Sequence, residues 1–164
     1  MIEKLVLIDS SGLLERPTPL LELYLDAAME TNPILRYQKV QNVFGDLYAD
    51  RSRLLPVVVD TFIATIQQQG AKHAFISSFD SSTKTQIESD EFKKIEDIPC
   101  LIIWGEEDKL IPLKPVDYAD MFQKKFQAAQ CTKIPDAGHA PFVEKTALAY
   151  EMLLTFLNDK SHQI

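Results

Sequence analysis

The sequence lacks a long apolar run and an excess of basic residues, and each absence excludes a class of function. No segment has the roughly eighteen consecutive apolar residues of a membrane span. The opening apolar run, 5–8, is closed by Asp9 before it reaches the length of a secretory signal. Lys and Arg total 17 against 24 Asp and Glu, and they are scattered. We therefore expect a cytoplasmic protein with neither a membrane nor a nucleic acid as partner.

The sequence also has few cysteines and histidines, the usual ligands of transition metals. Cys100 and Cys131 are its two cysteines, and their spacing fits no metal site. Both lie in apolar segments, which favours buried reduced thiols, with a disulfide between neighbouring strands as the alternative. His73 and His162 have no ligand partners at a suitable spacing. We expect no metal and no cofactor.

What is present is the pattern of an α/β protein. The chain of 164 residues is 46% hydrophobic, enough for one domain or for a small domain with an insertion. Continuous apolar runs at 5–8 and 99–104 are typical of strands covered on both faces of a parallel sheet. The segment 131–134 alternates, which favours an edge strand. Helical patterns follow the last two strands, so we expect right-handed parallel crossovers.

A long helical stretch separates the first two strands. Its helices are predicted from a Thr18-Pro19 start to Asn32-Pro33, over 34–44 with a stop at Gly45, from Leu55 to near Gly70, and over about 71–79. Residues 80–85 are predicted as a loop. Further along, Lys114-Pro115 is expected to open a helix that buries Val116, Ala119, Phe122 and Phe126. Leu148, Met152, Leu153 and Phe156 are expected to mark the buried face of the last helix.

Two polar side chains follow neighbouring strands at the point where each strand ends. Asp108 lies four residues after Trp104, and His139 lies five residues after Ile134. Parallel strands end at the same edge of a sheet, so these side chains can meet. A carboxylate fixes the tautomer of an imidazole and stabilises its protonated form, as acyl transfer requires. The simpler alternatives are a turn or capping role for Asp108 and a loop histidine bonded to the backbone.

These segments resemble the C-terminal portion of the α/β-hydrolase fold superfamily. The resemblance rests on Ile-Pro-Cys-Leu-Ile-Ile-Trp-Gly-Glu-Glu-Asp at 98–108, on Ile111-Pro112, on Ile-Pro-Asp-Ala-Gly-His at 134–139, and on Glu144. It implies an incomplete α/β-hydrolase fold of about three parallel strands with flanking helices. The core would comprise residues 1–12 and 80–164, and a helical cap insertion would comprise residues 13–79.

The same resemblance implies the residues of a site. Asp108 would be the acid of a hydrolytic triad, with Glu107 as the alternative, and His139 would be the base. Ser10, Ser11 and Trp104 would contact substrate at the sheet edge, the two serines alternatively making turn hydrogen bonds.

The nucleophile of such a triad is missing from the sequence. None of the five glycines, Gly12, Gly45, Gly70, Gly105 and Gly138, brackets a serine as G-x-S-x-G. We expect hydrolysis of a small apolar ester, lactone, epoxide or C–C substrate only if a nucleophile-bearing half complements the chain. The alternative is an inactive hydrolase remnant that acts as a binding or dimerisation module. The strand at 5–8 would expose an unpaired edge, for which we expect a second copy or an N-terminal half as partner.

Overall fold

A three-stranded parallel sheet forms the centre of the α/β part. The computed structural model describes residues 2–82 and 90–159, so His162 and residues 83–85 of the predicted loop lie outside the described residues. The strands are β1 (Leu5–Ile8), β2 (Cys100–Gly105) and β3 (Ala129–Ile134), in the spatial order β1-β2-β3. Both pairs are parallel. The predicted strands, their direction and the edge position of β3 are confirmed.

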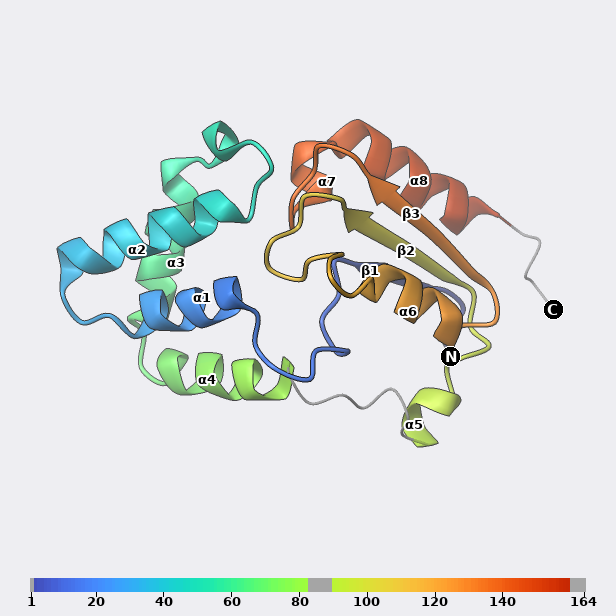
Figure 1. Ribbon diagram of the computed structural model, residues 1–164, viewed down its shortest axis with the longest axis horizontal. Coiled ribbons are helices and arrows are strands. Elements are labelled where there is room, and N and C mark those ends of the chain that lie inside the picture. The colour runs from blue at the N-terminus through green and yellow to red at the C-terminus, as the bar shows by residue number, and fades with distance from the viewer. Residues whose placement is uncertain (1, 83–89, 160–164) are drawn as a thin grey trace.

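Helices cover both faces of this sheet (Figure 1). The helix α6 (Tyr118–Lys125) lies on one face, and α7 (Pro141–Glu144) and α8 (Thr146–Asn158) lie on the other. The short helix α5 (Asp90–Lys93) precedes β2. All six residues of β2 are buried, as expected for a central strand whose alternate side chains enter two separate cores. Cys100, Ile102 and Trp104 pack in one core, and Leu101 and Ile103 pack in the other.

Four of the helices between β1 and β2, with a 3₁₀ turn, form a group that we call the helical block. It consists of α1 (Pro19–Met29), α2 (Pro33–Asp46), a 3₁₀ turn (Arg51–Arg53), α3 (Pro56–Ile66) and α4 (Ala71–Ser82). The predicted start of the first helix is confirmed, since Thr18 Oγ1 accepts a hydrogen bond from the amide of Leu21. Asn32 is predicted only to end that helix, but its Oδ1 also accepts from the amides that open α2, which begins at Pro33, one residue before the predicted start. In both cases proline occupies the first turn, where no amide hydrogen is needed.

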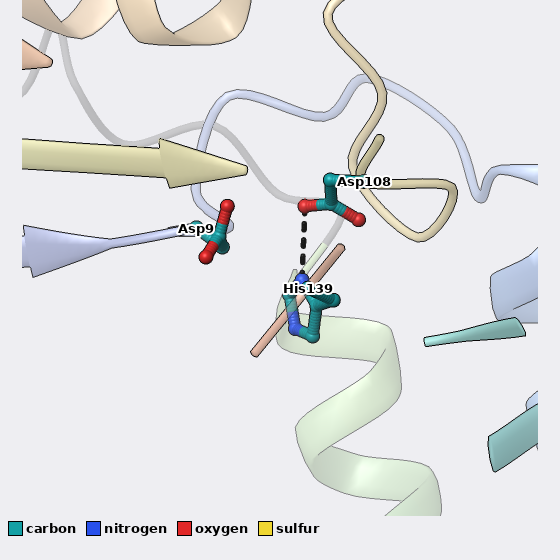
Figure 2. Close-up of side chains that lie close together, drawn as sticks. All are labelled: Asp9, Asp108 and His139. Carbon is teal, nitrogen blue, oxygen red and sulfur yellow. Dashed lines mark hydrogen bonds and ion pairs between the residues drawn. The ribbon is translucent and has the colours of Figure 1, made fainter. Parts of the chain in front are cut away.

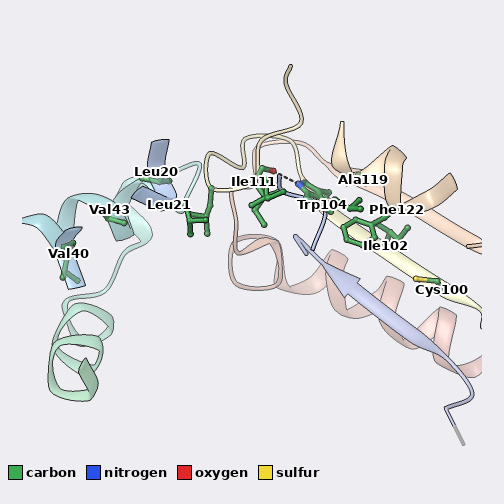
Figure 3. Close-up of a cluster of buried hydrophobic side chains, with 14 of the residues drawn as sticks. Leu20, Leu21, Val40, Val43, Cys100, Ile102, Trp104, Ile111, Ala119 and Phe122 are labelled. Atoms are coloured by element: carbon green, nitrogen blue, oxygen red, sulfur yellow. Dashed lines mark hydrogen bonds between the residues drawn. The ribbon is translucent and has the colours of Figure 1, made fainter. Parts of the chain in front are cut away.

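Aromatic rings hold the helical block together, and its apolar core continues into the sheet. Tyr24, Phe44, Phe62 and Phe75 contact one another with ring centroids 5.0 to 6.0 Å apart. Figure 3 shows the buried cluster passing from Leu20, Leu21, Val40 and Val43 on the helices, through Ile111 in the loop after β2, to Trp104, Ile102 and Cys100 on β2 itself. The block is therefore packed on the same core that supports β2.

Two helix ends differ from the prediction. Gly45 lies inside α2, which continues to Asp46, and α4 extends over the first residues of the predicted loop, to Ser82. A single glycine lowers helix stability by only about 1 kcal/mol, so packing of the surrounding helix can override it.

The helices after β2 and β3 also differ in detail. The helix α6 begins at Tyr118, after Pro115, because Asp117 Oδ1 accepts a hydrogen bond from the amide of Asp120 and caps the first turn. Val116 therefore lies outside the helix and is 40% exposed. Leu148 is 43% exposed, contrary to the prediction, whereas Phe156 is buried as predicted, together with Ala149. None of the helices in the described residues has the length and apolar character needed to cross a membrane.

Candidate active site

Asp108 occupies a tight turn immediately after β2. Its Oδ1 accepts hydrogen bonds from the amides of Leu110 at 2.7 Å and Ile111 at 3.0 Å. The carboxylate is fixed by the backbone that follows it, and the residue is 3% exposed. Its second oxygen, Oδ2, is free to face the neighbouring loop. The capping role that the sequence allowed and the pairing role that the resemblance implied are thus served by different oxygens of one carboxylate.

His139 lies in the loop after β3 and pairs with that second oxygen. Figure 2 shows its Nδ1 facing Asp108 Oδ2 across 3.0 Å. Burial of the imidazole acts to lower its pKa, but the hydrogen bond and the charge of Asp108 raise the pKa above its ordinary value. The ring keeps some contact with solvent, since its side chain is 25% exposed. With Nδ1 engaged by the carboxylate, Nε2 is the nitrogen left to exchange a proton.

Glycine stands at two close contacts of the His139 loop, one with the end of β2 and one with the helical block. A Cβ on Gly105 would lie 2.0 Å from the carbonyl oxygen of Gly138, and a Cβ on Gly138 would lie 2.3 Å from the carbonyl oxygen of Leu47. Both distances are far below van der Waals contact, so no side chain can be accommodated without moving backbone. This close approach brings Asp108 and His139 within hydrogen-bond distance.

Glu144 links the His139 loop to the helical block, a role that the sequence did not indicate. Its Oε1 accepts from the amide of Gly138 at 2.6 Å, and its Oε2 accepts from the amide of Ala49 at 2.9 Å. The residue is 5% exposed. Buried carboxylates are retained where several amide donors satisfy them. The sequence shows a glutamate shortly after Gly138-His139, but it does not indicate that this side chain bonds Ala49, 95 positions away.

Asp9 is a second buried carboxyl at the same edge, and sequence reasoning did not select it as a site residue. It directly follows β1, is 4% exposed and has a left-handed φ of 42°. Its Oδ1 accepts from the amide of Gly105 at 2.8 Å, whereas Oδ2 has no hydrogen-bond partner among the described residues. Burial raises its pKa to about 7, aided by the charge of Asp108 and opposed by the Gly105 amide. Its position directly after a strand was the available signal.

Asp9, Asp108 and His139 each place one polar atom within 4.8 Å of the others. Figure 2 shows the three side chains converging from three separate loops. Such a spacing could also hold a cation. Asp108 Oδ2 and His139 Nδ1 already bond each other, an arrangement suited to acid–base chemistry.

The predicted substrate contacts lie in different surroundings. Ser10 is half-buried and Ser11 is exposed, both next to Asp9. Trp104 is fully buried, and its Nε1 donates a hydrogen bond to the carbonyl oxygen of Ile111 at 3.1 Å. Core packing accounts for Trp104 without a ligand, and substrate contact by these three residues stays a prediction.

A cavity of about 820 Å³ adjoins the site between the helical block and the loop after β2. Asp108 is part of its wall. Apolar side chains from α1 and from the segment before α6 form much of the rest, including Leu20, Leu23, Pro112 and Val116. Its size is that of a small-molecule site.

Comparison with known proteins identifies the fold. No family model matches the chain. A meta-cleavage product hydrolase from Pseudomonas fluorescens IP01 superposes with a TM-score of 0.73 at 21% identity, over 95% of this chain and 56% of its own. An α/β hydrolase enzyme from a Medee basin deep-sea metagenome library gives 0.71 at 20% identity, over 100% and 60%. The chain has a partial α/β-hydrolase fold.

A curated relative agrees with this fold. Lipase 1 of Psychrobacter immobilis is 27% identical over 149 residues, which are 87% of this chain and 44% of the lipase. The chain thus spans about half the length of the proteins it matches. The predicted incomplete α/β-hydrolase fold, with three parallel strands and flanking helices, is confirmed.

Proposed function

We propose that this partial α/β-hydrolase supplies the acid and the base of a hydrolytic site whose nucleophile lies outside these 164 residues. The observation that carries the proposal is the 3.0 Å contact of His139 Nδ1 with Asp108 Oδ2, made by loops that leave adjacent parallel strands. The likeness to hydrolases with a fuller fold supports it. Glu107, the alternative acid, is exposed, whereas Asp108 is buried against the imidazole.

In this proposal His139 acts as a general base. Its Nε2 takes the proton of the nucleophile as that group attacks the substrate, and a covalent intermediate forms. The same nitrogen then protonates the leaving group and later activates water. Asp108 holds the Nδ1–H tautomer and stabilises the imidazolium that forms in each step. Its two amide contacts keep Oδ2 aimed at the ring throughout.

The nucleophile would enter beside β1. Within the described residues β1 pairs only with β2, so its other edge offers free backbone groups. Its four residues are all half-buried, whereas β2 is fully buried. A further parallel strand along this edge would end next to Asp9, near the imidazole. We propose an N-terminal half, or a second copy of this chain, as the partner, with residues 13–79 serving as the cap and residues 1–12 and 80–164 as the core.

The cavity supports the substrate class that the family resemblance implies. Its wall is largely apolar and includes Asp108, so a small apolar ester, lactone, epoxide or C–C substrate fits it. Matched proteins include a lipase and a meta-cleavage product hydrolase by name.

The test begins with the coding sequence upstream of Met1, read in all frames for G-x-S-x-G. A segment found there is co-produced with the chain and assayed with p-nitrophenyl butyrate. We expect turnover in the complex that His139→Ala lowers by about 10⁴- to 10⁶-fold. The exposed histidine of α4 gives the control, and His73→Ala should leave turnover unchanged. Full activity of the His139→Ala complex would contradict the proposal.

An inactive binding or dimerisation module is the second candidate. The absence of G-x-S-x-G from the 164 residues favours it. This candidate replaces the first if two results are obtained. No G-x-S-x-G motif is found upstream, and the isolated chain forms a dimer in analytical ultracentrifugation.

A further inference from the structure

Only one of the two carboxyl oxygens of Asp9 makes a hydrogen bond among the described residues. Its Oδ1 bonds the amide of Gly105, which is the last residue of β2 and the start of the turn that carries Asp108. Its Oδ2 is buried and has no partner among the described residues. Burying a polar atom without a partner is costly. The strained φ of 42° adds to that cost, although Asp tolerates it better than most residues.

Three ionisable side chains face this carboxyl, each from a different segment. Asp108 comes from the turn after β2, His139 from the loop after β3, and Glu144 from α7. Asp108 and Glu144 have their oxygens committed to backbone amides and to the imidazole. Asp50 near Glu144 is bound to its own turn through Ser52. His139 is therefore the neighbour whose charge can respond to that of Asp9.

We propose that Asp9 is a positioning residue for the Asp108–His139 pair. Through Gly105 it holds the turn of Asp108 in place, and through Oδ2 it sets a second carboxylate beside the imidazole, so that the ionisation of Asp9 and of His139 depend on each other. This inference rests on the proposed role of His139 as a base.

The charges of the cluster agree with this arrangement. The pKa of Asp9 is raised to about 7 by burial, so this carboxyl changes charge close to neutrality, where an imidazole does. The negative charge of Asp9 in turn contributes to raising the pKa of His139. Groups that interact in this way titrate as a coupled pair. Above neutral pH, ionised Asp9 helps to keep the proton on His139.

The test is an NMR titration of the His139 Cε1–H in the 164-residue chain and in Asp9→Asn. Asparagine tolerates the left-handed backbone and keeps an oxygen for the Gly105 amide, while it removes the charge. We expect the pKa of His139 to fall by about half a pH unit or more. Asp136→Asn is the matched control, because Asp136 also has a left-handed φ, of 51°, lies in the His139 loop and has an 88% exposed side chain. Equal curves for the two variants would overturn the proposal.

A second measurement uses the unmodified chain and does not depend on the folding of a variant. The side-chain carboxyl ¹³C signal of Asp9 is titrated with the His139 proton signal. We expect both curves to inflect over the same pH range, with the His139 curve broadened. Independent curves, each with one simple inflection, would overturn the coupling. Because neither experiment reads turnover, its failure leaves the proposed hydrolase function standing, and inactivity of the complex leaves the coupling standing.

Discussion

The backbone amide of His139 donates a hydrogen bond to the carbonyl oxygen of Leu47 at 2.7 Å. Leu47 is the C-cap that follows α2, so the helical block directly holds the loop of the proposed base. The contact joins residues 92 positions apart in sequence. The orientation of the imidazole thus depends on the helical block as well as on Asp108.

Gly138→Ala should separate these two segments. The added Cβ would lie 2.3 Å from the Leu47 carbonyl oxygen and 2.8 Å from the Ala49 amide nitrogen. We expect a loss of about 2 kcal/mol or more in the free energy of unfolding, measured in urea. Gly70→Ala is the control: no atom lies within 4 Å of its added Cβ, so only the strain of its φ of 81° should act, at a cost of about 1 kcal/mol. Equal losses would show that the contact is not tight.

Glu144→Gln should weaken the same junction by a different route. The amide group that replaces one carboxylate oxygen would turn an N–H towards a backbone N–H of Gly138 or Ala49. We expect about 1 to 3 kcal/mol of destabilisation by urea unfolding. Glu151→Gln on the exposed face of α8 should change stability by less than about 0.5 kcal/mol. An unchanged free energy of unfolding for Glu144→Gln would mean that water replaces the hydrogen bonds of the carboxylate.

Asp108→Asn should change the tautomer of His139 while leaving the turn intact. The asparagine oxygen can still accept from Leu110 and Ile111, but its amide group would face Nδ1 as a donor. We expect the proton of neutral His139 to move to Nε2, observed in ¹H–¹⁵N long-range spectra. Turnover of the complemented enzyme should fall by about 10⁴-fold. An unchanged tautomer would contradict the assigned orientation.

The stability of the chain should fall as pH rises towards neutrality because of Asp9. In the folded state this carboxyl keeps its proton up to a pKa of about 7, whereas in the unfolded chain it ionises near 3.8. Between these pH values the folded state binds more protons than the unfolded chain. The stabilisation that comes from this difference is fully present below pH 3.8 and is lost as the pH rises to 7. The Asp9→Asn variant should not show this loss. The difference in free energy of unfolding between the variant and the original chain should therefore grow in favour of the variant from pH 3.8 to 7, by on the order of 2 to 4 kcal/mol. A constant difference in urea unfolding from pH 4 to 7 would contradict this prediction.

Local patterns predicted the elements, and long-range contacts explain what they missed. The apolar runs identified β1 and β2, and Thr18 marked the start of α1, because burial and capping act over a few residues. The loops of Asp108 and His139 could be placed at one edge because parallel strands share it. Asp9 and Glu144 could not be assigned a function in this way. Their roles depend on Gly105, Gly138 and Ala49, which are 6 to 96 positions away.

The single apolar core shared by sheet and helical block limits how a ligand can reach Asp108. Swinging the block outward as a rigid lid would bring side chains such as Leu20 and Val43 into water together with Trp104. That exposure resembles partial unfolding more than hinge opening. Entry and exit of small molecules should therefore occur through the existing cavity of about 820 Å³, with the block stationary.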